Sequence, residues 1–123
     1  MEIKNMKEIP FMEFPTGRKT RVMIGQNGAL TGEKFCQGFV EIFPGGTIPS
    51  HSHETVESYT ILRGTGLMKV ENNSQVMNEG DFIFIESNQN HCLKNIGNGI
   101  LHLMFVYAPQ MIVDHWEQEK NGL

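Results

Sequence analysis

Turn-forming residues recur at short intervals along the chain and limit it to short, closely spaced elements. They cluster at positions 16–17, 25–28, 31–32, 44–46, 64–66, 78–80, 87–90 and 95–99. Such spacing is typical of β-hairpins, because each hairpin needs a tight turn. A chain of 123 residues has room for one domain of ordinary size. We therefore expect a single β-rich domain over residues 1–123.

The segments between these turns are rich in Phe, Ile, Val and Tyr, which favour strands. They are residues 34–43, 57–62, 67–71, 81–85, 91–95 and 100–107. Before Gln110 no segment combines helical periodicity with helix-start and helix-stop signals, and only Met111 to Glu119 is compatible with one short helix. The predicted fold class is all-β with a short C-terminal tail.

Composition excludes several classes of protein. Hydrophobic residues make up 39% and charged residues 20% of the chain, and no apolar run is long enough to cross a bilayer. The 14 acidic and 10 basic side chains give a net charge of -4, which argues against nucleic acid as a partner. The N-terminal residues lack the continuous apolar core of a secretory signal, so we expect a soluble, cytoplasmic protein with no membrane partner.

The two cysteines give no framework for disulfides or for zinc bound by thiolates. Cys36 and Cys92 are 56 positions apart and form no CxxC pair, so reduced thiols are expected. Cys92 follows His91 and is predicted to point to the opposite face of its strand, where a buried thiol acts as a small hydrophobic group.

Side chains with metal-ligating groups are concentrated in two stretches. On a strand, His51 and His53 project from one face about 7 Å apart, and Glu57 has the same parity. Imidazole and carboxylate together suit borderline divalent transition metals better than Ca or Mg. His91, from the second stretch, supplies a fourth ligand of the same type. The pattern predicts one metal site.

Both stretches resemble the two sequence motifs of the cupin superfamily. The first reads Gly45, five residues, His51-x-His53, three residues, Glu57, six residues and Gly64, which matches the motif at every defining position. The second reads Gly80, five residues, Glu86 where the motif has proline, Asn88 where it has glycine, then His91 and Asn95. Both departures fall in the turn before His91, where asparagine tolerates a positive φ. The resemblance implies a double-stranded β-helix, or jelly-roll, barrel with a core at about residues 34–109.

The resemblance also implies a site. His51, His53, Glu57 and His91 would bind one divalent transition metal, which is Mn, Fe, Ni, Zn, Co or Cu, and its open side would face a cavity. Strand parity places Tyr59 in that cavity, with Ile61 and Leu93. Tyr59 is a candidate catalytic residue or a core tyrosine satisfied by the backbone, and His102 is a cavity acid/base or a core histidine.

Further polar and aromatic residues each have two interpretations. Gln37 and Glu41 are pocket groups or edge residues, and Arg21 pairs a substrate carboxylate at the cavity mouth or is an exposed arginine. His115 and Trp116, in the tail, form a lid or a subunit contact by packing alone.

The resemblance leaves several functions open. We expect an enzyme that uses the metal as a Lewis acid on a small polar oxygenated metabolite, of isomerase, epimerase, lyase or decarboxylase type. The alternatives are an Fe- or Cu-dependent dioxygenase and a non-catalytic small-molecule-binding or accessory protein. Strands 81–85 and 100–107 are apolar on both faces, which favours a homodimer.

Overall fold

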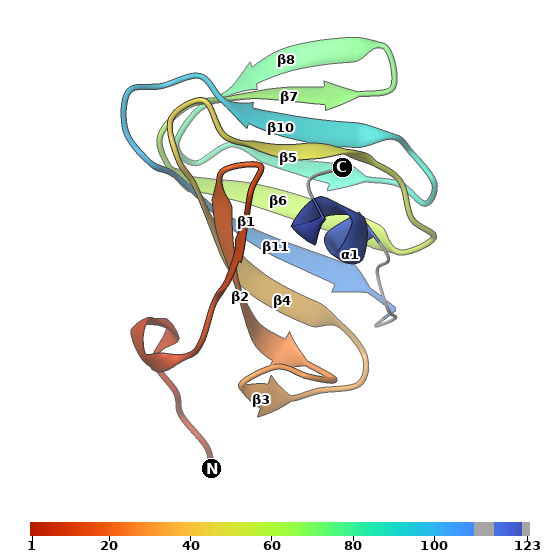
Figure 1. The fold of residues 1–123 in the computed structure, drawn as a ribbon. Helices are drawn as coiled ribbons and strands as arrows, with labels where there is room; N and C mark the ends of the chain where they lie inside the picture. Colours follow the sequence, from red (N-terminus) through yellow and green to blue (C-terminus); the bar gives the residue numbers. More distant parts are fainter. Residues whose placement is uncertain (110–114, 122–123) are drawn as a thin grey trace.

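Two β-sheets form most of the molecule. The computed structural model describes residues 1–109 and 115–121. A short 3-10 helix, η1 (Met6–Glu8), precedes the strands, and the helix α1 (His115–Lys120) follows them (Figure 1). The predicted all-β class is confirmed, and the arrangement is a two-sheet jelly roll.

The larger sheet has the strand order β1-β2-β4-β11-β6-β9, with β3 beside β2. Its strands are β1 (Met12–Phe14), β2 (Arg18–Gly25), β3 (Leu30–Thr31), β4 (Cys36–Ile42), β6 (Val56–Arg63), β9 (Phe82–Ile85) and β11 (Leu101–Ala108). Every pairing in it is antiparallel except that of β2 with β3.

The smaller sheet has the order β5-β10-β7-β8. Its strands are β5 (Thr47–His51), β7 (Gly66–Val70), β8 (Asn73–Met77) and β10 (His91–Asn95). All three pairings are antiparallel, and β10 meets β5 with His91 directly opposite His51. The register of this strand pair therefore brings two of the predicted ligands together.

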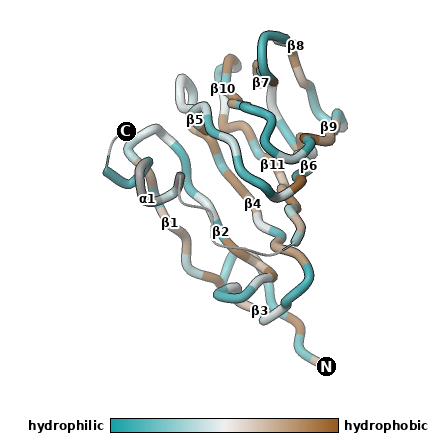
Figure 2. Tube along the Cα trace, turned by 90° about the vertical axis from the view of Figure 1, so that its right-hand side faces the viewer, coloured by the Kyte–Doolittle hydropathy of each residue, from teal (hydrophilic) through white to brown (hydrophobic). Residues whose placement is uncertain are grey.

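The core lies between the two sheets. Residues in β11 alternate between buried and half-buried, so that Leu101, Leu103, Phe105 and Tyr107 face inward. They form one cluster with residues of the smaller sheet such as Ile48. In contrast to this apolar core, the turn joining β7 and β8 at the tip of the molecule is hydrophilic (Figure 2). The alternation of buried and half-buried residues along β11 is the period-2 pattern of a strand with one face in the core.

Strands beyond those predicted also form. β1, β2 and β3 precede Lys34, where no strand was expected, and β5 and β8 lie outside the strand-prone segments named above, although His51 was expected on a strand. β5 contains Pro49 but is an edge strand, where a missing N–H is tolerated. β8 is the other edge and is mostly exposed and polar, so it lacks the apolar alternation that signals a strand.

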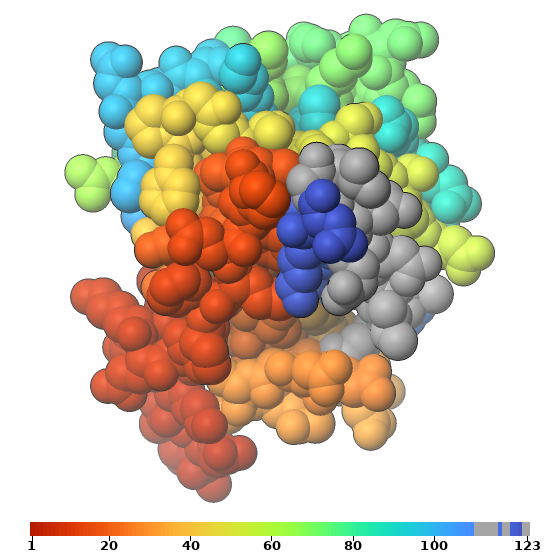
Figure 3. Space-filling view, viewed as in Figure 1, coloured from red at the N-terminus to blue at the C-terminus, as the bar shows by residue number. Residues whose placement is uncertain are grey.

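Helix α1 lies against the first strand of the chain. It contacts β1, and the space-filling view shows it (blue) beside the N-terminal strands (Figure 3). The helix predicted within Met111 to Glu119 is found at His115–Lys120, and residues 111–114 lie outside the described part. Within residues 1–109 and 115–121, no helix has the length and apolar character needed to cross a membrane.

Gly38 allows β4 and β11 to pack closely. A Cβ atom there would lie 2.5 Å from the carbonyl oxygen of Arg21 and closer still to the ring of Phe105. We expect Gly38→Ala to lower the free energy of unfolding by about 1–3 kcal/mol, because the core is overpacked. Chemical denaturation measures this loss. Gly99→Ala is the control, since no atom lies within 4 Å of its added Cβ. Equal stability of the two variants would contradict the packing.

Candidate metal centre

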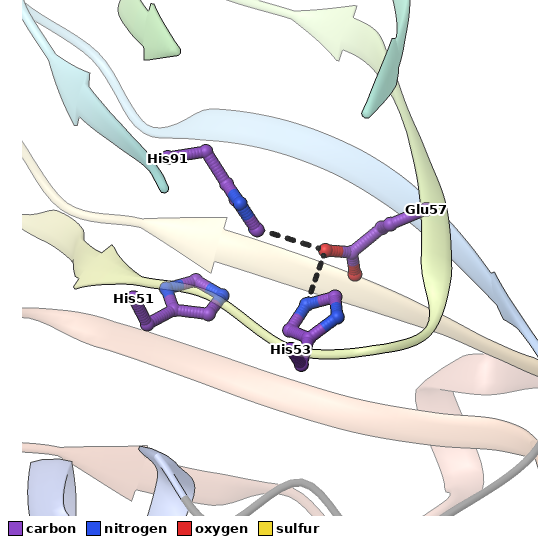
Figure 4. A group of neighbouring side chains, drawn as sticks. All are labelled: His51, His53, Glu57 and His91. Carbon is purple, nitrogen blue, oxygen red and sulfur yellow. Dashed lines mark hydrogen bonds and ion pairs between the residues drawn. The ribbon is translucent and has the colours of Figure 1, made fainter. Parts of the chain in front are cut away.

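Four side chains converge at one end of the core. His51 ends β5, His53 follows it in a loop, Glu57 lies on β6, and His91 begins β10. One nitrogen or oxygen atom from each lies within 4.8 Å of the others (Figure 4). The expectation that His51, His53 and Glu57 share one strand face is wrong, because β5 ends at His51 and Glu57 belongs to the other sheet. They meet where the chain passes from one sheet to the other.

Backbone carbonyls orient all three imidazole rings. The Nδ1 atom of His51 lies 2.7 Å from the carbonyl oxygen of Pro49, and that of His53 lies 3.0 Å from the carbonyl oxygen of Thr55. The Nδ1 atom of His91 lies 2.8 Å from the carbonyl oxygen of Gln89. Because a carbonyl oxygen only accepts, each Nδ1 carries the proton and Nε2 is the nitrogen suited to a metal. Such contacts fix the tautomer and the ring orientation before any ligand binds.

Glu57 supplies the negative charge of the cluster. Its Oε1 atom lies 3.2 Å from Nε2 of His53 and 3.2 Å from Nε2 of His91. Burial acts to raise the pKa of Glu57, but its contacts with His53 and His91 outweigh burial and hold the pKa below its ordinary value. Glu57 therefore stays ionised although it is buried.

The pKa values of His51 and His53 are shifted in opposite directions. Burial and the neighbouring His91 lower the pKa of His51 to about 3, so this imidazole is neutral at pH 7. Burial also acts to lower the pKa of His53, but the hydrogen bond and the charge of Glu57 outweigh it and raise the pKa. A neutral imidazole is the form that binds metal.

These shifts predict how the stability of the metal-free protein depends on pH. The pKa of His51 is about 3 in the folded chain and about 6.5 in an unfolded one. Below pH 6.5 the unfolded state therefore binds the extra proton, and stability falls as the pH drops towards 3. The slope is at most about 1.4 kcal/mol per pH unit. Glu57 adds a further loss of stability as the pH falls near and below its ordinary pKa.

His51→Gln isolates the contribution of this histidine. Urea titrations of the metal-free variant between pH 6.5 and 4.5 should show a shallower pH dependence than those of the parent protein. Identical slopes would show that the pKa of His51 is the same in the folded and the unfolded protein, which would contradict the account.

The donor set and its spacing fit one transition-metal ion. Metal–ligand bonds of about 2.1 Å allow ligand atoms to lie at most about 4.2 Å apart. The widest pair in the cluster lies within 4.8 Å, so the side chains need to close by only about half an ångström. Three imidazoles and one carboxylate suit Mn, Fe, Co, Ni, Cu or Zn, whereas Ca and Mg prefer oxygen ligands alone.

The turn before His91 keeps its shape despite the residues that depart from the motif. Asn88 occupies the glycine position with φ 64°, a left-handed conformation that asparagine tolerates. Its N–H donates to the carbonyl of His53 at 2.8 Å, which ties the two motifs together. The N–H of Glu86 donates to the side chain of Gln89. The two departures therefore do not displace His91 from the cluster.

A small cavity of about 20 Å³ lies beside the cluster, enough for roughly one water molecule. Tyr59 lines it, with its ring 6.0 Å from that of His91. Burial, together with the charge of Glu57, raises the pKa of Tyr59 well above its ordinary value, so the phenol keeps its proton. Ile61 and Leu93 are fully buried in the adjoining core.

The other polar candidates lie on the outer face of the larger sheet. His102 is half-buried against Phe39, with ring centroids 5.6 Å apart, and does not line the cavity. Arg21 pairs with Glu41. Gln37 donates to the sulfur of Met104 at 3.1 Å. On each strand these residues alternate with the inward-facing ones.

Several cavity residues were not predicted from the sequence, and they are Arg18, Val40, Ile48, Phe105 and Tyr107. Trp116 also lines the cavity, and it was expected only in a lid or a subunit contact. Tyr107 shares the parity of Leu103 and Phe105 in β11, and this signal was available. Burial raises the pKa of its phenol, as does a hydrogen bond with the buried thiol of Cys36.

Comparison with known proteins identifies the family. A family model described as a cupin domain matches residues 38–107, more than half of the chain. The chain belongs to the cupin family. An uncharacterized protein of Methanocaldococcus jannaschii is 40% identical to this cupin over 60 residues. That match covers 48% of each chain, so it spans about half the length of the relative.

Solved structures share the cupin fold at low sequence identity. A predicted oxalate decarboxylase from Thermotoga maritima is 20% identical, with a TM-score of 0.79, and the match covers 88% of this cupin and 99% of that chain. The polyketide cyclase RemF from Streptomyces resistomycificus is 16% identical, with a TM-score of 0.75, and the match covers 100% and 98% of the two chains. These likenesses show the fold alone.

Proposed function

We propose that this cupin is an enzyme that holds one divalent transition metal through His51, His53, Glu57 and His91. Its substrate would be a small polar oxygenated metabolite. The observation that carries the proposal is the convergence of four ligand atoms within 4.8 Å, beside a cavity. Three carbonyl contacts that orient the imidazoles support it, because a site arranged in advance binds metal at little cost.

The reaction class follows from the cluster and its neighbours. A bound ion supplies Lewis acidity toward a carbonyl, carboxylate or hydroxy-carbonyl oxygen. The ionised Glu57 offsets the positive charge there. The phenol of Tyr59 keeps its proton and hydrogen-bonds Glu57, so a substrate oxygen would compete with Glu57 for this donor. Phe105 and Ile48 add apolar surface to the cavity wall. This set supports isomerisation, epimerisation, elimination or decarboxylation.

Metal content and turnover test the proposal together. Protein purified from metal-replete cells should carry about one equivalent of Mn, Zn, Ni or Co per chain, since one cluster is present. Turnover of a panel of hydroxy and keto acids and sugars should disappear with a chelator and return with the metal. A site selective for Fe or Cu, with oxygen consumption, would replace the Lewis-acid reaction by a dioxygenase. Full turnover without metal would refute the proposal.

We further propose that this cupin works as a cytoplasmic homodimer. Both cysteines are free thiols, as a reducing compartment allows. Phe82 and Phe84 on β9 and Leu62 on β6 are exposed on the outer face of the larger sheet, and exposed apolar surface of this kind favours association. Light scattering should give the mass of two chains, and the mass of one chain would contradict the dimer.

A further inference from the structure

A buried arginine lines the cavity beside the metal cluster. Arg18, on β2, is 2% exposed and forms part of the same cavity wall as Tyr59. Its Nε and Nη2 atoms donate to the two carboxylate oxygens of Glu119, at 2.7 and 2.5 Å. Nη1 donates to the hydroxyl of Thr20. The guanidinium therefore holds a carboxylate in the two-pronged geometry that arginine favours.

The carboxylate comes from the C-terminal helix. Glu119 is fully buried on α1, and Trp116 of the same helix lines the cavity. The Trp116 ring packs edge-on against Phe14 and Phe105, with centroids 6.4 and 6.2 Å apart. Helix α1 lies beside β1 in both the ribbon and the tube views (Figures 1 and 2). One short helix therefore supplies the partner of Arg18 and an aromatic wall of the cavity.

The cavity is too small for a metabolite while α1 stays in place. Its volume of about 20 Å³ suits one water molecule, whereas small-molecule pockets measure about 300–1,000 Å³. Trp116 forms part of the cavity wall, and Glu119 is paired with Arg18, another residue of that wall. Entry of a substrate requires that α1 be displaced.

Stability alone does not account for a buried ion pair at this place. Removing two charges from water is costly, and apolar residues of similar size are often as stable or more so. The surroundings of Arg18 include the rings of Phe14 and Trp116, which would pack well against an apolar side chain. By contrast, Arg21 and Glu41 form a part-exposed pair on the outer face of the same sheet, which is an ordinary surface ion pair.

We propose that Arg18 binds a carboxylate group of the substrate and that Glu119 occupies this subsite as an internal carboxylate until the substrate displaces it. The inference rests on the proposed function and narrows the substrate to a small carboxylate-bearing metabolite. A second oxygen group on the metabolite would face the metal cluster. Exchange of one carboxylate for another keeps the buried guanidinium paired throughout, so neither state leaves an isolated charge.

Trp116 is the single tryptophan of the chain and reports the position of α1 directly. The probes are malonate, a small dicarboxylate, and malonamide, its uncharged analogue. Malonate should shift the fluorescence of Trp116 in a saturable way, and malonamide should not. Arg18→Gln should abolish the response, whereas Arg21→Gln, a change on the same strand, should retain it. An equal response to malonamide, or an unchanged response in Arg18→Gln, would overturn the proposal.

Glu119→Gln tests the internal carboxylate. Removing the competitor should tighten apparent malonate binding by about tenfold if the closed state is favoured by a similar factor. Glu41→Gln, in the outer pair, should leave it unchanged. An affinity that stays the same or falls in a folded Glu119→Gln protein would overturn the proposal.

A double variant, Arg18→Met with Glu119→Met, guards against misfolding because it removes both charges together. This variant should fold, and malonate should not change its Trp116 fluorescence. A fluorescence response to malonate would contradict the proposed subsite. Titration with Zn²⁺ separates the two claims. Zn²⁺ binding without the malonate response refutes only this inference, whereas the malonate response without Zn²⁺ binding refutes only the proposed metal site.

Discussion

Replacing His91 with alanine should weaken metal binding by more than about 100-fold, since even the loss of a group that only orients a ligand costs about 10–100-fold. His91 is fully buried opposite His51, and its Nε2 atom points to Glu57. Among the residues that the structure describes, only His51 and His53 supply other nitrogen atoms to the cluster. Isothermal titration of metal-free protein with Zn²⁺ measures the change.

His102→Ala is the matched control for this experiment. It removes an imidazole from the outer face of β11, where the ring packs against Phe39 and does not line the cavity. Zn²⁺ affinity should match that of the parent protein. If His91→Ala bound Zn²⁺ as tightly as His102→Ala, the ion would be held elsewhere.

Replacing Phe105 with alanine should lower the free energy of unfolding by about 3–5 kcal/mol, the range for truncating a large buried aromatic side chain. The ring is buried, stacks on Tyr107 and meets the edge of Trp116. Its loss leaves a void between the larger sheet and α1. Urea denaturation followed by circular dichroism gives the value.

Phe35→Ala is the corresponding control, because this ring is 39% exposed just before β4. Its truncation should cost less than about 1 kcal/mol. Similar losses for the two variants would show that Phe105 does not belong to a packed core.

The fold class and the ligand types could be predicted because local signals carry them. Turn residues and apolar alternation identified β6, β10 and β11, and the alternation in β6 places Tyr59 and Ile61 inward with Glu57. The left-handed Asn88 also follows from a local preference. Such features depend on neighbours along the chain, which a sequence displays.

The rest of the site depends on contacts between distant segments. β2 begins with RKTR, and nothing local indicates that Arg18 and Thr20 are buried. Arg18 is inside because Glu119, 101 positions away, neutralises it there. Likewise, His51 and Glu57 lie on different sheets, and only the fold brings them together. Pairings of this kind leave no periodic signal.

The central claim is that one ion is bound by His51, His53, Glu57 and His91. X-ray absorption at the metal edge of the loaded protein tests it most directly. The account predicts about three nitrogen and one oxygen ligands from the protein at about 2.0–2.2 Å, with any remaining positions taken by water. A spectrum with sulfur ligands, or one left unchanged by His91→Ala, would contradict it.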